Sequence, residues 1–328
     1  MEILHSFQTI VQYHCCHQFP KSMNMLCFTK FSNISMIITL LFGFRPGHFT
    51  ELDALKITDN LTKQMDKMKI PINIYIDLSK AFDTLNHSIL IEKLLYYGIC
   101  GNENNLICNY LSGRHQYVDY NGAKSKTQML TTGVPQGSIL GPLLFLIYIN
   151  DLPSASAIFD MLMYADDTTL YCNLNEDINE FEINNELNKI NTWLSSNKLC
   201  LNIKKTKFMI FHSNHRTILT PRLTINNIDI ECVKQFNFLG LILNSQLTWT
   251  NHIEHIAKKI SRVIGVLYRL KQIYPQAVLL MLYNALIVPH FSYCILIWGS
   301  KISNGHALHL STKKYVKRGL CSSFGTYL

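Results

Sequence analysis

The chain has 328 residues, of which 48% are hydrophobic and 16% are charged, so it can bury a sizeable core in one large or two modest domains. Its net charge of +8 favours an anionic partner but is too small to identify that partner as nucleic acid. Ten cysteines without paired spacing, together with no secretory leader, predict a reduced intracellular protein. No apolar run is long and uninterrupted enough to predict a membrane-spanning helix, so no membrane partner is expected.

The first half of the chain shows both helical and strand-like periods. Residues 1–41 have no clear period and stay unassigned. Apolar spacing then predicts, in order, a helix, a strand that ends on Asp77 and a second helix, over residues 52–68, 72–77 and 88–97. Asn121-Gly122 favours a tight turn, which predicts a hairpin over residues 116–131. A loop at 133–137 precedes an apolar helix expected over 141–150.

The second half opens with two strand-like runs, 158–163 and 168–171, on either side of Tyr164-Ala165-Asp166-Asp167. This pattern predicts a tight β-hairpin with two carboxylates at its tip. The later elements are expected to be a helix, a strand, a second hairpin around two asparagines and a long helix, over residues 176–197, 207–211, 226–227 and 252–274. Because strands and helices alternate irregularly, we expect an α+β fold.

Asp77, Asp166 and Asp167 are the candidate reactive groups. Adjacent carboxylates repel each other, and a divalent cation such as Mg²⁺ relieves that repulsion. Asp77 ends its predicted strand 89 residues before Asp166, so a sheet pairing the two segments would gather three acids. Such a set suits two Mg²⁺ ions about 3.5–4 Å apart. Taken singly, the Asp pair fits a solvated turn and Asp77 fits a strand-end cap.

Six motifs follow one another between residues 42 and 300: FGFRPGH at 42–48, YIDLSKAFDT at 75–84, GVPQGSILGPLLF at 133–145, YADDT at 164–168, NIKKT at 202–206 and FLG at 238–240. In this order they resemble the motifs of reverse transcriptases from non-LTR (LINE-type) retrotransposons, and more distantly those of group II intron maturases. Each motif alone is moderately specific, whereas six in order are very specific. The resemblance implies a right-hand polymerase with fingers, palm and thumb and an antiparallel palm sheet.

The resemblance also implies domain boundaries and a metal site. Residues 42–245 correspond to fingers and palm, and residues 246–328 to a thumb-like helical region that looks truncated. Asp77, Asp166 and Asp167 take the positions of the family's catalytic, metal-binding acids, and the backbone carbonyl of Leu78 that of a further ligand. The implied cofactor is a pair of Mg²⁺ ions, with Mn²⁺ as a substitute.

Four residues match nucleotide-binding positions in the family: Leu78, already given as a metal ligand, and Arg45, Phe82 and Gln136. Arg45 matches an arginine whose rigid fork suits triphosphate oxygens. Phe82 takes the position of the sugar gate, where an aromatic ring leaves no room for a 2′-hydroxyl. Gln136 matches the residue that lies against the nucleotide. Without the resemblance, Arg45 reads as a solvated turn residue and Phe82 as a core residue.

Further matches concern the leaving group and the primer. Lys205 aligns with a lysine proposed as general acid toward pyrophosphate, and Lys204 is its rival. Phe238, Leu239 and Gly240 resemble the primer grip, although an ordinary buried strand explains Phe238 and Leu239 equally well. The helix over 252–274 would be the thumb, where basic side chains meet a duplex backbone or simply form a solvated face: Lys258, Lys259, Arg262, Arg269 and Lys271.

The implied activity is RNA-directed DNA polymerisation, with an RNA template, a DNA primer and dNTPs as partners. An alternative is a catalytically inactive nucleic-acid-binding remnant of a retroelement. The absence of the family's usual segment from residues 1–41 and the modest positive charge support that alternative. Two further departures from the family are Phe49-Thr50 in place of a typical Ser-Thr pair and residues 311–328, which look like a truncated end. RNA-directed RNA synthesis is disfavoured by Phe82.

Overall fold

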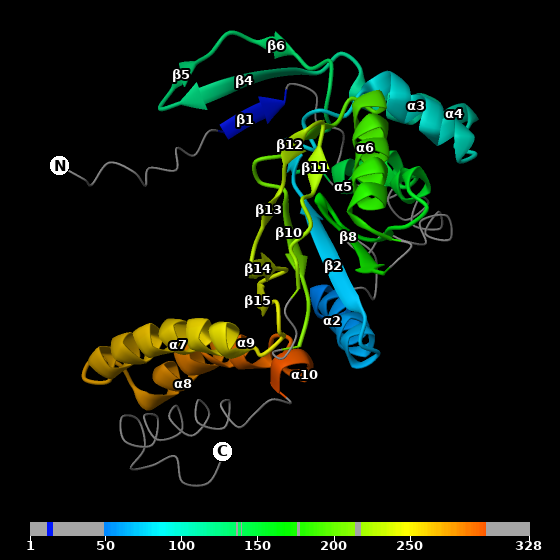
Figure 1. The fold of residues 1–328 in the computed structure, drawn as a ribbon. Coiled ribbons are helices and arrows are strands. Elements are labelled where there is room, and N and C mark those ends of the chain that lie inside the picture. Colours follow the sequence, from blue (N-terminus) through cyan, green and yellow to red (C-terminus); the bar gives the residue numbers. More distant parts are fainter. Residues whose placement is uncertain are drawn as a thin grey trace, which may run out of the picture.

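The computed structural model describes residues 12–15, 49–135, 137–138, 140–175, 178–213 and 218–299. Figure 1 shows a small sheet beside a pair of helices at one end, a larger sheet in the middle and a group of helices at the other end. The elements of the upper end are β1, β4, β5, β6, α3 and α4, at Gln12–Cys15, His115–Tyr120, Ala123–Lys124, Gln128–Met129, His87–Tyr96 and Gly101–Leu111.

The central sheet has the strand order β13-β10-β2-β8-β7. These strands span Glu231–Cys232, Lys207–Ile210, Ile70–Ile76, Asp167–Leu174 and Asp160–Tyr164. The pairings β10–β2, β2–β8 and β8–β7 are antiparallel, whereas β13 joins β10 in parallel. The predicted α+β fold with an antiparallel sheet is therefore confirmed, with one parallel pairing at its edge that the sequence did not predict.

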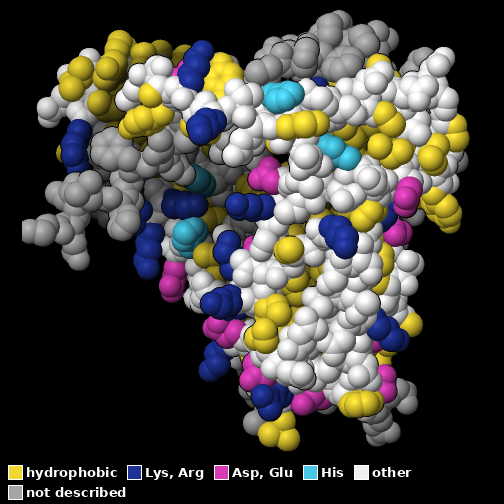
Figure 2. All heavy atoms as spheres, turned by 90° about the horizontal axis from the view of Figure 1, so that it is seen from above, with side chains coloured by type: hydrophobic (Ala, Val, Ile, Leu, Met, Phe, Trp, Pro, Cys, Tyr) yellow, Lys and Arg dark blue, Asp and Glu magenta, His cyan; other side chains and the backbone are white. Residues whose placement is uncertain are grey.

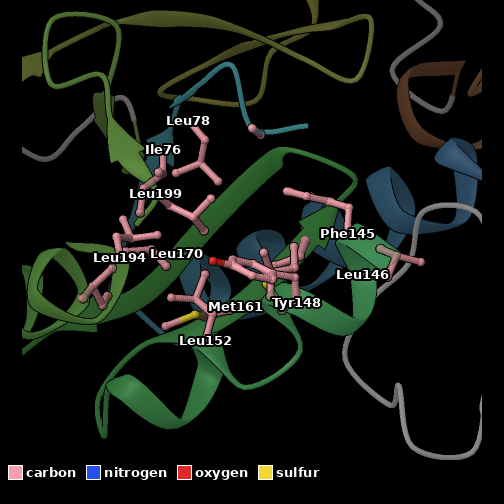
Figure 3. Packing of buried hydrophobic residues seen from close by; sticks show 14 of the residues in the cluster. Ile76, Leu78, Phe145, Leu146, Tyr148, Leu152, Met161, Leu170, Leu194 and Leu199 are labelled. Carbon is pink, nitrogen blue, oxygen red and sulfur yellow. The ribbon is translucent and has the colours of Figure 1, made fainter. Parts of the chain in front are cut away.

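The two faces of the central sheet pack into different cores. Along β2, Ile72, Ile74 and Ile76 point to one face and Tyr75 to the other, as the two-residue period of a strand requires. The isoleucine face packs against α3, α5 (Leu140–Ile149) and α6 (Glu180–Ser196), and Figure 3 shows side chains of this core. The Tyr75 face packs with α2 (Thr50–Asp66) and the carboxyl-terminal helices.

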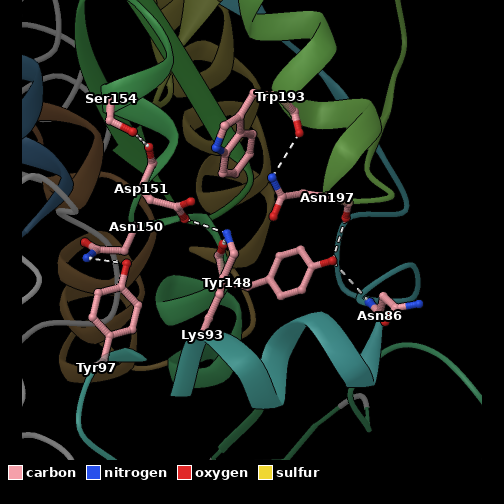
Figure 4. A network of polar contacts seen from close by, with 9 residues as sticks. All are labelled: Asn86, Lys93, Tyr97, Tyr148, Asn150, Asp151, Ser154, Trp193 and Asn197. Carbon is pink, nitrogen blue, oxygen red and sulfur yellow. Dashed lines mark hydrogen bonds and ion pairs between the residues drawn. The ribbon is translucent and has the colours of Figure 1, made fainter. Parts of the chain in front are cut away.

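Helix α5 is buried on all sides, which explains why its sequence is almost entirely apolar. A polar network fixes it to its neighbours (Figure 4). Lys93 of α3 donates to the Tyr148 carbonyl at 2.7 Å and to Asp151 at 2.5 Å. The Tyr148 hydroxyl donates to the Asn197 carbonyl and accepts from the Asn86 backbone N–H. Burial lowers the pKa of Lys93, and Asp151 opposes that shift by favouring the charged form.

The upper sheet confirms the turn that the sequence predicted. Asn121 and Gly122 both have positive φ, 49° and 84°, which is the pattern of a type I′ hairpin turn. The returning strand is broken into the short pieces β5 and β6, both of which pair with β4. Strand β1 pairs with β4 on its other side, with Gln12 opposite Asp119. That pairing lies in the segment that the sequence left unassigned.

Helix α6 begins four residues later than expected, because Asn179 caps it by accepting from the N–H groups of Phe181 and Glu182. The remaining short elements connect these parts: β3, β9, β11, β12 and a 3₁₀ turn at Leu78–Ser79, Cys200–Leu201, Thr224–Ile225, Ile228–Asp229 and Leu152–Ala155. The strands β11 and β12 form the expected hairpin around residues 226–227.

The carboxyl-terminal part consists of one hairpin and a group of helices. Strands β14 and β15 span Gln235–Phe238 and Leu241–Asn244, and α7, α8, α9 and α10 span Thr250–Leu270, Gln276–Leu286, Val288–Ser292 and Ile295–Trp298. The predicted long helix is thus confirmed as α7, whose buried stripe includes Ile253, Ile256 and Ile260. Among the described residues, no helix has both the length and the apolar character needed to cross a bilayer.

Candidate functional site

Asp77 and Asp167 lie at the same end of two paired strands. In the antiparallel β2–β8 pair, Ile76 stands opposite Thr168. One step further along this register, Asp77 faces Asp167. Asp77 directly follows β2 and Asp167 begins β8, so the sheet gathers the two acids that the sequence places 90 residues apart.

Asp166 occupies the tip of the β7–β8 hairpin. The pair Tyr164–Asp167 closes the hairpin, which leaves Ala165 and Asp166 as the two turn residues. Ala165 has a φ of 55°, in the left-handed region that a residue with a Cβ seldom adopts. The turn leaves the Asp166 side chain exposed beside Asp167.

The three acids influence one another electrostatically. The pKa of Asp167 is raised, first by loss of hydration at its position in the sheet and then by the negative charges of Asp166 and Asp77. A bound cation would relieve this repulsion, and carboxylate oxygens are the ligands that Mg²⁺ prefers. Within the described ranges, however, no set of three or more His, Cys, Asp or Glu side chains forms a metal site by itself. The acids therefore fit the donor chemistry of such an ion without forming a complete set of ligands.

The segment that contains Lys204 and Lys205 is attached to the backbone of Asp77. The N–H of Asn202 donates to the Asp77 carbonyl at 2.9 Å, and the N–H of Thr206 donates back to the Asn202 carbonyl. Leu78, the next residue after Asp77, pairs with Leu201 in the β3–β9 ladder. These bonds place Lys205 beside the acids, with its Nζ 3.9 Å from Oδ2 of Asp77.

A cavity of about 510 Å³ opens in front of Asp77 and Asp167. Lys204 and Lys205 line one side of it, and Phe238 and Leu239 of the β14–β15 hairpin line another. The structure thus brings together three predicted groups that the sequence could only order along the chain: the acids, the lysine pair and the candidate primer grip.

Aromatic stacking fixes the hairpin to the sheet. The rings of Tyr75 and Phe236 lie 3.7 Å apart and nearly parallel, at 7°. Tyr75 shares its face of β2 with Asp77, so the stack holds the hairpin next to the acids. The sequence reasoning missed both aromatic residues as parts of the site. The spacing of Tyr75, two positions before Asp77, was the available signal for one of them.

Phe82 does not line this cavity. Its ring is half-buried against the main core, with the ring centroid 4.6 Å from that of Phe145. The loop that contains Phe82 is instead held by the loop at Gly133: the N–H of Gly133 donates to the Leu85 carbonyl at 2.7 Å, and that of Val134 to the Phe82 carbonyl at 2.9 Å. A Cβ at Gly133 would come within 2.7 Å of the Asp83 carbonyl oxygen, so these two loops meet at a glycine.

Two of the predicted nucleotide contacts, Arg45 and Gln136, lie outside the described residues.

The lysines and arginines of α7 lie within the described residues. The pKa of His255 on the same helix is lowered; loss of hydration is the first cause, and the charges of Lys259, Arg262 and Lys258 follow. Figure 2 shows Lys and Arg side chains gathered beside a hollow on one face of the molecule.

The family profile described as "Reverse transcriptase (RNA-dependent DNA polymerase)" matches residues 12–243. A probable RNA-directed DNA polymerase from transposon X-element of Drosophila melanogaster is 26% identical over 272 residues, which is 79% of this chain and 29% of that protein. An RNA-directed DNA polymerase from mobile element jockey of the same species is 26% identical over 230 residues, 66% of this chain and 24% of that protein.

A Pol polyprotein from the type-1 retrotransposable element R1 of Bradysia coprophila is 26% identical over 266 residues, 78% of this chain and 26% of that protein. The chain therefore spans less than a third of the length of these curated relatives. A solved structure of telomerase from Candida albicans aligns with a TM-score of 0.49 and 13% identity, covering 93% of this chain and 55% of that one.

Proposed function

The chain belongs to the reverse transcriptase family, and on that premise we propose that it is an RNA-directed DNA polymerase of the non-LTR retrotransposon type. It adds dNTPs to the 3′-hydroxyl of a DNA primer paired with an RNA template. One observation carries the proposal: Asp77 and Asp167, which adjoin the last β2–β8 pair, Ile76–Thr168, line one cavity that the β14–β15 hairpin also lines.

The proposed metal ligands are the carboxylates of Asp77, Asp166 and Asp167 and the backbone carbonyl of Leu78. Two Mg²⁺ ions bound there, or Mn²⁺ in their place, would supply activation of the 3′-hydroxyl and charge stabilisation of the departing pyrophosphate. The pKa of Asp167 is raised first by loss of hydration and then by the charges of Asp166 and Asp77, and this second contribution supports the assignment because bound cations would neutralise it.

The chain's own side chains have distinct proposed roles around that centre. Lys205 protonates the pyrophosphate oxygen as the bond to the α-phosphate breaks, and Lys204 stays at the wall of the cavity as a counter-charge. Phe238, Leu239 and Gly240 hold the primer end. Phe82 excludes a 2′-hydroxyl, a role that rests on its position in the motif at 75–84, since its ring packs against Phe145 and does not line the cavity at Asp77 and Asp167. Arg45 and Gln136 contact the nucleotide.

The proposed domain division follows the same assignment. Residues 42–245 form fingers and palm, and residues 246–328 form a thumb-like region in which α7 lies along the template–primer duplex. The lysines and arginines of α7 supply affinity that does not depend on sequence and that falls as salt rises. Residues 1–41 keep no assigned role.

The test is extension of a labelled DNA primer on an RNA template by the purified protein, with Mg²⁺ and dNTPs. We expect wild-type extension, and a loss to about one hundredth or less in Asp77→Asn and Asp167→Asn, since charge stabilisation contributes at least that factor. Asp160→Asn is the matched control, because Asp160 is an exposed acid of the same sheet. No extension by wild type, or full extension by Asp77→Asn, contradicts the proposal. Salt-sensitive duplex binding without incorporation identifies the inactive remnant instead.

A further inference from the structure

The turn between β14 and β15 is held by a tyrosine from the carboxyl-terminal helices. Phe238 pairs with Leu241, so Leu239 and Gly240 are the two central turn residues, and both have positive φ, 46° and 81°. The hydroxyl of Tyr293 donates to the carbonyl oxygen of Leu239 at 2.5 Å. The tyrosine ring also covers Gly240, since a Cβ built there would lie 3.4 Å from its Cε1 atom.

Tyr293 is itself fixed from three sides. The indole N–H of Trp298, in α10, donates to the Tyr293 carbonyl at 3.0 Å. The N–H of Tyr293 donates to the Pro289 carbonyl in α9 at 3.1 Å. The next residue, Cys294, donates its N–H to the side chain of Glu51 in α2 at 3.3 Å. The tyrosine hydroxyl is therefore presented from a rigid position.

The hairpin needs such support. Among the described strands, β14 and β15 pair only with each other, and an isolated two-stranded hairpin is marginally stable in water. Its turn also places Leu239, a residue with a Cβ, in the left-handed region, where the Cβ crowds the following carbonyl oxygen. The Tyr75–Phe236 stack supports the strands, and the Tyr293 hydrogen bond supports the turn.

We propose that Tyr293 is a positioning residue for the primer 3′ end. By fixing the Leu239 carbonyl and covering Gly240, it sets the wall of the cavity that faces Asp77 and Asp167. This inference rests on the proposed role of the hairpin in holding a primer. Tyr293, directly after α9, would then help to shape the cavity at the acids, whereas α7 would contact the duplex.

The test compares Tyr293→Phe with Tyr283→Phe, a half-buried tyrosine of α8 in the same helical region. Affinity is measured for an RNA–DNA duplex with a recessed 3′ end and for the same duplex with a blunt end, without dNTPs. We expect Tyr293→Phe to bind the recessed duplex about three- to tenfold more weakly, the effect of one lost hydrogen bond, and the blunt duplex unchanged. Amide hydrogen exchange over residues 235–244 is expected to accelerate, and Tyr283→Phe to match wild type.

In primer extension the same variant is expected to raise KM for the primer and to leave KM for dNTP unchanged. An equal loss of affinity for both duplexes, or unchanged recessed-end affinity with unchanged hydrogen exchange, overturns the positioning role. The two proposals fail separately. If wild type extends no primer but still prefers the recessed duplex, and Tyr293→Phe removes that preference, polymerase activity is refuted and the positioning role stands.

Discussion

The ammonium group of Lys205 lies 3.9 Å from the carboxylate of Asp77; the Lys205 side chain is 70% exposed and that of Asp77 is 40% exposed. That separation is longer than a hydrogen bond, and an exposed ion pair of this kind contributes little to stability. Lys205 is therefore held near the acids without being fixed to them. Such a group can move to a leaving oxygen during the reaction.

Replacing Lys205 with alanine is expected to slow single-nucleotide incorporation about a hundredfold, the lower range for loss of a general acid. Lys204→Ala, the matched neighbour on the same wall of the cavity, is expected to change the rate by less than about fivefold. The measurement is the single-turnover rate with saturating dNTP, with thermal unfolding as a check on folding. A larger effect of Lys204→Ala would transfer the general-acid role to that residue.

Neutralising Asp166 is expected to stabilise the metal-free protein while it stops extension. The pKa of Asp167 is raised in the folded state, first by loss of hydration and then by the charges of Asp166 and Asp77, so its ionised form costs folding free energy at neutral pH. Asp166→Asn removes part of that cost and should raise the Tm in EDTA at pH 7. The gain should fade as the pH approaches the ordinary carboxyl range, where Asp167 becomes protonated. Asp160→Asn serves as control, and an unchanged or lower Tm for Asp166→Asn would refute the repulsion.

Replacing Phe82 with valine is expected to lower the preference for dNTPs over rNTPs by about tenfold or more, because a smaller side chain admits the 2′-hydroxyl. The readout is the ratio of kcat/KM for dNTP to that for rNTP. Phe181→Val removes an exposed ring on α6 and should leave the ratio unchanged. Unchanged selectivity in Phe82→Val would make Phe82 a core residue only.

Gly133→Ala is expected to destabilise the protein strongly. Gly133 has a φ of 79°, and a Cβ there would lie 2.7–2.8 Å from the backbone of Asp83. Conformational strain and overpacking together should cost about 3–4 kcal/mol. Gly122→Ala is the matched control, because Gly122 has a similar φ of 84° with nothing within 4 Å, and it should cost only about 1–2 kcal/mol. Urea unfolding measures the free energy of unfolding of both variants. Equal losses of stability would show that the loop at Asp83 shifts to make room for the added Cβ.

The free energy of unfolding is expected to fall as the pH is lowered from 6.5 to 4, because of His252. The ring is 2% exposed between Trp249 and Trp298, and it accepts a hydrogen bond from the Ile242 N–H. Burial first, and then His255 and Lys259, lower its pKa from 6.5 to about 4. The unfolded chain therefore takes up a proton at a higher pH than the folded protein.

Stability due to His252 is thus complete above pH 6.5 and is lost as the pH falls toward 4, by about 3 kcal/mol. Urea unfolding at several pH values between 6.5 and 4 measures the slope of the unfolding free energy against pH. His252→Phe should flatten it, while His115→Gln, at an exposed position, should not. An unaltered slope in His252→Phe would assign the acid sensitivity to other groups.

Local signals in the sequence predicted the elements well. The Asn121-Gly122 turn, the strand ending on Asp77 and the apolar stripe of α7 all follow from spacing or turn chemistry within a few residues. The β7–β8 hairpin was predicted in the same way. Such features depend on neighbours along the chain, so one sequence is sufficient to recognise them.

Contacts between distant segments were not accessible in this way. No pattern in residues 12–15 predicts that they pair with β4, and no local sequence pattern predicts the parallel pairing of β13 with β10. The approach of Asp77 to Asp167 was predicted only on the condition that their two segments pair in one sheet, and no local signal predicts that pairing. The Tyr75–Phe236 stack and the Tyr293 hydrogen bond depend on how packed elements meet, which no spacing rule describes.

The alternation along β2 couples correct folding to the alignment of the acids. A slip of one residue against β8 would turn Tyr75 and Asp77 toward the core around α5 and Ile74 and Ile76 toward the core around α2, so that neither core would pack as it does. A mispaired chain would then lose its larger core and its aligned carboxylates in one step. The register of β2 against β8 is therefore a requirement shared by the core and by the alignment of the acids.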